Sequence, residues 1–149
     1  MRVWLKRAVL IGLAALAVAQ FIQPSKDNPP IDPARSIDAA PFHQPEVAAI
    51  FERACNDCHS HKTVWPWYGK VAPISWYLSY DVKKGRSELN FSEWSAYTPQ
   101  QSQKLLREIC EEVSEGKMPG KAYTLAHPSS ALTDADIQTL CAWTKVAQQ

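Results

Sequence analysis

Two cysteines and a histidine at residues 55–59 form the pattern in this sequence with the clearest chemical meaning. The segment reads Cys55-Asn56-Asp57-Cys58-His59, which has the C-x-x-C-H form of a covalent haem attachment site. Two cysteines at this spacing can each form a thioether with one of the two haem vinyl groups. The histidine that follows then lies under the ring, where a neutral imidazole nitrogen can bind iron. The pattern predicts one haem c per chain, attached to Cys55 and Cys58 and ligated by His59.

Other uses of a C-x-x-C pair stay open. A thioredoxin-like dithiol would lie beside a βαβ pattern, and none is present. A zinc site needs four close nitrogen or sulfur ligands, and His61, Cys110 and Cys141 lack the usual paired spacing. A plain disulfide within the motif would leave His59 without a role. Covalent haem attachment is the interpretation that uses all three motif residues.

The sixth iron position has one thioether candidate. Apart from the initiator, the only methionine is Met118, which lies in a loop after a predicted helix end, within Gly116–Gly120. A thioether is a common second ligand in electron carriers, whereas the alternative role for Met118 is to fill a gap in the core. His127 is the rival ligand, and His61 and His43 are weaker ones.

The ligand set decides between functions. A closed, sulfur-ligated iron suits an electron carrier that exchanges single electrons with redox partner proteins. An open or histidine-ligated iron would suit a peroxidase-like haem enzyme, a haem-based sensor or an accessory module. The sequence has no Ser-His-Asp set, phosphate loop or suitably spaced carboxylate pair, so an enzyme is the less favoured alternative. A net charge of +1 without a basic stripe gives no sign of nucleic-acid binding.

Two segments precede the predicted domain. Residues 1–22 begin with Arg2, Lys6 and Arg7 and continue as an uncharged apolar run, the pattern of an export signal. This segment is either a cleaved signal peptide or a helix that anchors the chain in the inner membrane, and both place the remainder in the periplasm. Residues 23–44 are rich in proline and form a linker, either a spacer from the membrane or a strap on the domain surface. Residues 45–149 form a single haem-binding domain.

Apolar residues recur at helical spacing in this domain, and no strand pattern of useful length is present. Four main helices are expected, bounded by Pro45 and Cys55, by Pro73 and Gly85, by Thr98 and Gly116, and by Thr133 and the C-terminal residues. A short turn of helix is expected at residues 90–94. Gln101 completes a capping box with Thr98, and Asp136 stands three residues after Thr133. The last helix is expected to bury Ile137, Leu140, Cys141, Trp143 and Val146.

Cys110 and Cys141 lie on the predicted inner stripes of the last two of these helices. In an oxidising compartment two nearby thiols tend to pair, so a disulfide is favoured. The alternative is two separate buried thiols that pack as small apolar side chains. The predicted all-α fold class does not depend on whether this disulfide forms.

Several further motifs resemble the haem-binding domain family of small bacterial proteins with a single C-x-x-C-H. The likeness runs from about Gln20 to Trp143 and rests on these segments: Gln20–Pro24, Asn28–Pro30, Cys55–Ser60, Trp65–Tyr68, Val71–Pro73, Gly85-Arg86, Asn90–Trp94, Met118-Pro119, Tyr123, His127-Pro128 and Trp143. The resemblance implies a helical, cytochrome c-like haem domain. It supplies no substrate, and it says nothing about Cys110 or Cys141.

Overall fold

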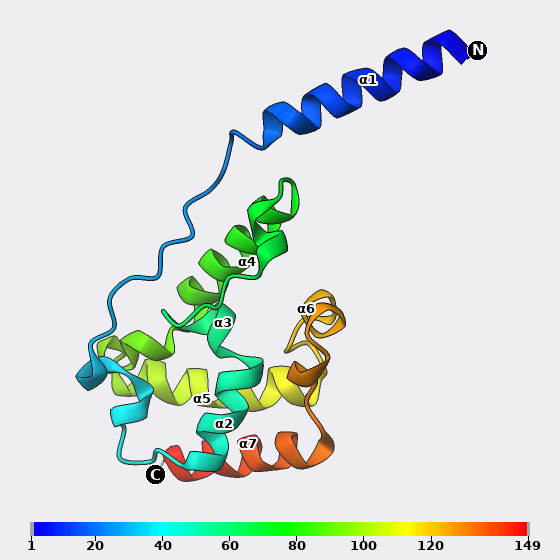
Figure 1. The fold of residues 1–149 in the computed structure, drawn as a ribbon. Helices are drawn as coiled ribbons and strands as arrows, with labels where there is room; N and C mark the ends of the chain where they lie inside the picture. Colours follow the sequence, from blue (N-terminus) through cyan, green and yellow to red (C-terminus); the bar gives the residue numbers. More distant parts are fainter. Residues whose placement is uncertain (1, 149) are drawn as a thin grey trace.

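Helices make up the regular structure of the computed structural model, which describes residues 2–148 (Figure 1). The α-helices are α1 (Arg2–Ala19), α2 (Pro45–Ala54), α3 (Asn56–His59), α4 (Ile74–Glu88), α5 (Pro99–Ser114), α6 (Lys121–Ala126) and α7 (Asp134–Ala147). Five short 3-10 helices join them: η1 (Pro33–Arg35), η2 (Ile37–Ala39), η3 (Trp67–Lys70), η4 (Phe91–Ala96) and η5 (Pro128–Ser130). No strand occurs among residues 2–148, and the predicted all-α class is confirmed.

The capping residues and the glycine that the sequence predicts at the ends of α5 and α7 are present in the structure. The capping box of α5 is present, with the Gln101 amide donating to Thr98 Oγ1 and the Thr98 amide donating to Gln101 Oε1. The capping box of α7 is present as well, formed by Thr133 and Asp136. Gly116 follows α5 with φ of 66°, the left-handed conformation that a glycine adopts most easily. The chain therefore turns away from α5 immediately before the Met118 loop.

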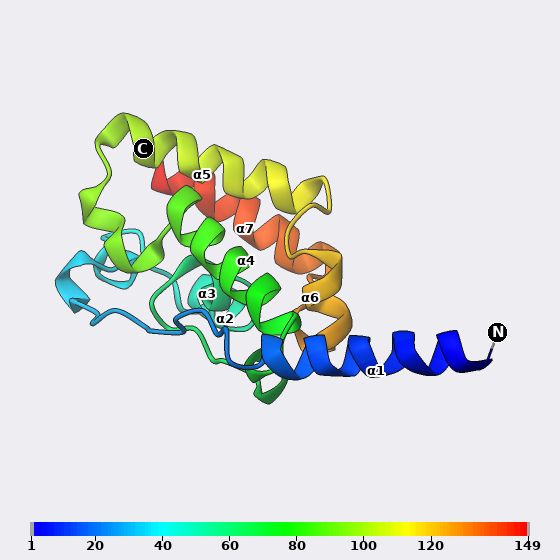
Figure 2. The ribbon, with the colours of Figure 1, turned by 90° about the horizontal axis from the view of Figure 1, so that it is seen from above.

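The core lies where α2 packs on the pair formed by α5 and α7, which run antiparallel (Figures 1 and 2). Phe51 stacks on Phe91 with ring centroids 4.4 Å apart, and Trp143 meets Phe51 edge-on at 5.3 Å. The indole N–H of Trp143 donates to the carbonyl of Phe42, so this buried donor is satisfied. Val146, expected to be buried, is 54% exposed because it lies in the last turn of α7, beyond the contact with α2. The core is built from these side chains: Ile37, Val47, Ile50, Phe51, Phe91, Trp94, Leu106, Ile109, Val113, Leu140 and Trp143.

The proline-rich segment lies along the domain as a strap. Immediately before this segment, Gln20 exchanges hydrogen bonds with the backbone of Ala72, donating from Nε2 to the carbonyl and accepting from the amide. The side chain of Asn28 donates to the carbonyl of Thr63 at 2.8 Å. Farther along the strap, Ile37 inserts into the core and is only 4% exposed. Of the two arrangements expected for this segment, spacer and strap, these contacts are those of a strap.

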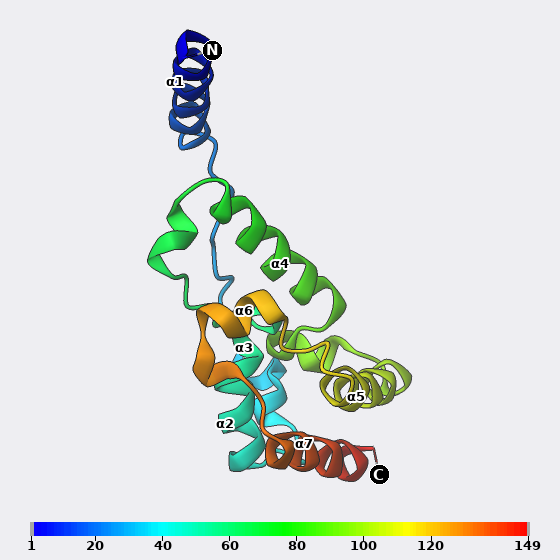
Figure 3. The ribbon, with the colours of Figure 1, turned by 90° about the vertical axis from the view of Figure 1, so that its right-hand side faces the viewer.

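Helix α1 projects away from the rest of the chain in all three ribbon views (Figures 1–3). None of its described residues is buried. Within residues 2–148, no helix combines the length and the apolar character needed to cross a membrane. The expected membrane anchor is therefore not supported. Helix α1 has 18 residues and carries Arg2, Lys6 and Arg7 among its first six, which leaves too short an uncharged part.

A disulfide between Cys110 and Cys141 joins α5 to α7, with the two Cα atoms 4.9 Å apart. It closes a loop with a sequence separation of 31 residues. Because such a cross-link restricts the unfolded chain, replacing both cysteines by serine should lower the free energy of unfolding by about 3 to 4 kcal/mol. Chemical denaturation of the intact protein measures this. Mass spectrometry of unreduced, alkylated protein should find both thiols protected, and two alkylated residues at these positions would contradict the bond.

The start of α7 gives a pH-dependent prediction. The hydrogen bond from Arg53 at 2.6 Å, together with bonds from Thr133, lowers the pKa of Asp136 from 3.8 to about 2. A carboxyl whose pKa is lowered by folding stabilises the folded state at any pH above its pKa in the unfolded chain. This contribution is lost as the pH falls toward 2. Asp136→Asn should therefore lower the melting temperature at pH 7 but differ progressively less from the unsubstituted protein below pH 3.8. Asp134→Asn is the control, because it leaves the pair with Arg53 intact.

Candidate haem site

The imidazole of His59 is held by the end of α4. Its Nδ1 lies 3.1 Å from the carbonyl oxygens of both Gly85 and Leu89, which fixes Nδ1 as the protonated donor. Nε2 is then the nitrogen that carries a lone pair, as an iron ligand requires. Burial also lowers the pKa of His59, which favours the neutral ring. The orientation and the charge state of this side chain both suit axial ligation.

Gly85 allows the two helices to come this close. A Cβ atom at position 85 would lie 2.6 Å from the carbonyl oxygen of Cys58, which is backbone and cannot move aside without shifting α3. The expectation that Gly85 ends its helix is wrong, since α4 continues to Glu88. This glycine is instead an interior helical residue at a close contact with the motif.

Cys55 and Cys58 are free thiols. Burial raises the pKa of Cys55 to about 12 and that of Cys58 to about 11, so both are protonated at neutral pH. A redox-active dithiol or a zinc thiolate needs the opposite shift. In the part of the chain that the structure describes, no three His, Cys, Asp or Glu side chains are grouped as a metal site would require.

Two neighbouring cavities open beside His59. One, of about 470 Å³, is bordered by Cys55, His59 and Met118 together with apolar residues of α5 and η4: Phe91, Leu105, Ile109 and Val113. The other, of about 240 Å³, is bordered by Cys58, His59 and Met118 together with residues of α4 and α6, among them Tyr77, Gly85 and Tyr123. Helix α3 packs on α4, and α6 reaches α3 through the hydrogen bond from Tyr123 to Asp57. The two thiols, the imidazole and one thioether therefore lie around two cavities whose linings share His59 and Met118.

Met118 does not fill the core, because its side chain is 40% exposed and borders both cavities. Its loop is tied to the end of α5, where the amides of Lys117 and Met118 both donate to the carbonyl of Glu112, at 3.0 and 3.2 Å. The structure thus brings together Cys55, Cys58, His59 and Met118.

His127 is not brought to these two cavities. It borders a third cavity, of about 360 Å³, which His59 does not line. There the His127 Nε2 pairs with the Tyr68 hydroxyl at 2.7 Å, and its ring stacks on Tyr123 at a centroid distance of 4.6 Å. Four residues of α4 line the same cavity: Ile74, Tyr77, Leu78 and Val82. Ligation of the iron by His127 would require both its hydrogen bond and its stacking to be given up.

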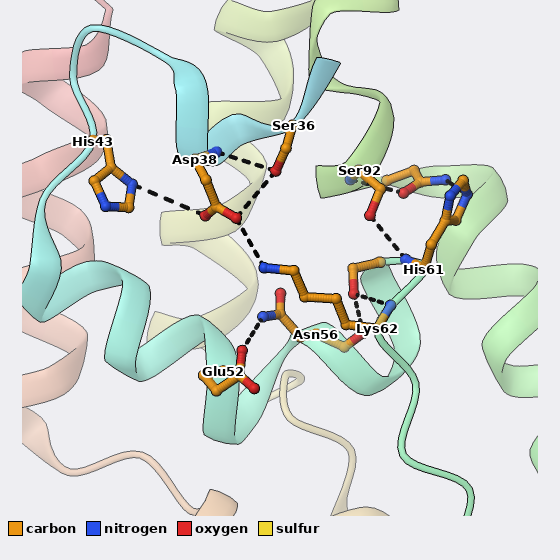
Figure 4. A network of polar contacts seen from close by, with 10 residues as sticks. Ser36, Asp38, His43, Glu52, Asn56, His61, Lys62 and Ser92 are labelled. Atoms are coloured by element: carbon orange, nitrogen blue, oxygen red, sulfur yellow. Dashed lines mark hydrogen bonds and ion pairs between the residues drawn. The ribbon is translucent and has the colours of Figure 1, made fainter. Parts of the chain in front are cut away.

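The chain leaves the motif through a polar network that ties it to the strap (Figure 4). The amide of His61 donates to the hydroxyl of Ser92 at 2.9 Å, and the ammonium of Lys62 contacts Asp38 at 2.8 Å. Although burial alone would raise it, the hydrogen bond and charge of Lys62 lower the pKa of Asp38 overall. His61, one of the weaker ligand candidates, faces Asn90 through Nε2 at 2.9 Å. His43, the other, lies 4.0 Å from Asp38.

The side chain of Arg86 connects the strap to the loop that follows the haem motif. Its guanidinium donates to the Ser60 carbonyl and the Thr63 hydroxyl, both at 2.8 Å. It also donates to the Asn28 side chain at 2.7 Å and to the Asp27 carbonyl at 3.2 Å. Sequence reasoning did not assign this role, and no periodic signal would have found it, since the partners lie up to 59 residues away.

Tyr123 and Asp57 form a second contact that sequence reasoning missed. The Tyr123 hydroxyl donates to Asp57 Oδ2 at 2.7 Å. Burial, followed by this hydrogen bond, raises the pKa of Tyr123, so its hydroxyl stays a donor at any ordinary pH. Short α6, which carries Tyr123, was not predicted either.

The close contact at Gly85 gives a prediction for haem loading. Gly85→Ala should push α3 off α4, which displaces the carbonyls that orient His59 and destabilises the fold by about 1 to 3 kcal/mol. We expect less haem per polypeptide and a lower melting temperature. Gly120→Ala is the matched control, because its Cβ meets nothing within 4 Å and its φ of −59° suits alanine. Equal haem loading in the two variants would contradict this account of Gly85.

A protein-family model described as the haem-binding domain matches residues 14–146, which include the strap, the motif and the residues around both cavities. Searches of curated proteins and of solved structures found no match. The match agrees with the geometry at His59, and haem is the cofactor to which both point. The chain belongs to the haem-binding domain family.

Proposed function

We propose that this protein is a monohaem c-type cytochrome that carries single electrons between redox partner proteins in the periplasm. One observation carries the proposal: a neutral imidazole, oriented by two backbone carbonyls, borders the same cavities as two free thiols and a thioether. The haem, when bound, supplies an iron that alternates between ferric and ferrous states. The side chains named here hold and orient it.

Covalent attachment is supported by the state of the two thiols. Each thiol adds across one vinyl double bond, so that sulfur bonds to one carbon and the proton ends on the other, with no external oxidant or reductant. Cys55 and Cys58 are protonated, unpaired and adjacent to the cavities that His59 borders. An attached haem cannot dissociate, which suits a small exported carrier.

The placement of the two candidate sixth ligands supports electron transfer and not catalysis at an open iron. Met118 borders the cavities that contain His59, and a thioether ligand raises the reduction potential and closes the iron to small molecules. His127, which could act as an acid-base group in a peroxidase-like enzyme, is engaged with Tyr68 in a different cavity. We therefore favour a carrier with Met118 as the sixth ligand.

Export is supported by two independent features. The basic residues followed by an apolar run at the N-terminus are typical of an export signal. The Cys110–Cys141 disulfide requires an oxidising compartment to persist, as the bacterial periplasm provides.

The test is to purify the protein from a bacterial host with c-type maturation and to record its spectrum before and after acid-acetone extraction. We expect one haem per chain that resists extraction, and a thioether-to-iron absorption band in the oxidised protein that Met118→Ala abolishes. Cys55→Ala and Cys58→Ala should each leave one thioether, and the double variant none. Colourless extracted protein would refute covalent attachment. A high-spin spectrum with rapid cyanide binding would instead support the enzyme or sensor alternatives.

A further inference from the structure

Asp57, the second variable residue of the C-x-x-C-H motif, bonds to two segments outside the motif. Its Oδ1 accepts from the amide of Val64 at 2.7 Å, and its Oδ2 accepts from the hydroxyl of Tyr123 at 2.7 Å. Its carbonyl oxygen accepts from the Thr63 hydroxyl, again at 2.7 Å. Asp57 therefore links α3 both to the loop that follows the motif and to α6.

Tyr123 lies at the far end of the loop that carries Met118. The near end of this loop is tied to α5, because the amides of Lys117 and Met118 donate to the carbonyl of Glu112. Tyr123 stands five residues after Met118, and its hydroxyl ties the other end to the haem motif itself. The loop thus has one attachment to a core helix and one to the segment that binds the cofactor.

The hydrogen bond from Tyr123 to Asp57 is suited to holding this end of the loop in place. A hydrogen bond to a carboxylate is roughly twice as strong as one between neutral groups, and Tyr123 is partly buried where it borders the cavity of His59 and Met118. Its ring also stacks on His127 with an interplanar angle of 24°. Removing the hydroxyl alone would keep the stacking and release only the bond to Asp57.

We propose that Tyr123 and Asp57 are positioning residues for the sixth iron ligand, and that their hydrogen bond keeps residues 117–122 closed so that the Met118 thioether stays at the iron. The inference rests on the proposed function, because it needs Met118 as the ligand. Neither residue touches the iron, and both act through the loop.

Competition by imidazole tests this in the intact, oxidised haem protein, because imidazole can bind only when the thioether has left the iron. The apparent affinity for an added ligand scales with the fraction of open protein. Loss of a hydrogen bond to a charged group corresponds to a factor of roughly 10 to 100. Tyr123→Phe should therefore tighten imidazole binding roughly 10- to 100-fold, and the thioether-to-iron band should disappear at a lower temperature.

Tyr68→Phe is the matched control, since it removes a hydroxyl with an equally short bond, to His127, that does not hold the Met118 loop. Its imidazole affinity should stay within about twofold of the unsubstituted protein. Equal affinities in the two variants would overturn the inference. So would the absence of the thioether-to-iron band from the unsubstituted protein, although haem that resists extraction would then still support covalent attachment.

Asp57→Asn keeps an acceptor for the Val64 amide but weakens the bond from Tyr123, and it provides the second variant if Tyr123→Phe does not fold. If both residues act through one bond, the double variant should bind imidazole no more tightly than Tyr123→Phe alone. Effects that multiply in the double variant would show that the two residues act separately, which contradicts the proposal.

Discussion

The close approach of α3 to α4 is the contact on which the haem site depends. Two carbonyls at the end of α4 hold His59: that of Gly85, which also accepts from the amide of Leu89, and that of Leu89, the residue that follows the helix. Only a residue without a Cβ lets the carbonyl of Cys58 pass beside α4 at that point. A single backbone contact thus sets the position of the motif and the direction of its imidazole together.

The rest of the site is assembled from short elements that depend on one another. Helix α3 has four residues and α6 has six, too few for either to be stable alone. Their positions come from side-chain bonds between segments distant in the chain, such as Asp57 to Tyr123, and from the backbone bonds at Glu112. The larger helices α2, α5 and α7 provide the packed core to which these pieces are attached.

The features that could be predicted from the sequence are the local ones. The haem motif, the helices begun by Pro45, Thr98 and Thr133, and the two capping boxes depend on residues within a few positions of one another. Gly85 was misread because a glycine that ends a helix and a glycine that admits a neighbouring backbone look alike in sequence. The partners of Arg86 and Tyr123 could not be found, since such pairings exist only once the chain has folded. The short helix α6 was not predicted, because Pro119 and Gly120 precede it and its six residues are too few to show apolar residues at helical spacing.

Arg86 makes the strap and the haem motif a thermodynamically linked pair. One guanidinium bonds to Ser60 and Thr63 on the motif side and to residues 27–28 on the strap side. Linkage is reciprocal, so whatever free energy cofactor capture contributes to ordering residues 60–63 also favours docking of the strap. To the extent that haem orders residues 60–63, the protease resistance of the strap should increase with haem occupancy, although no strap residue lines the cavities beside His59.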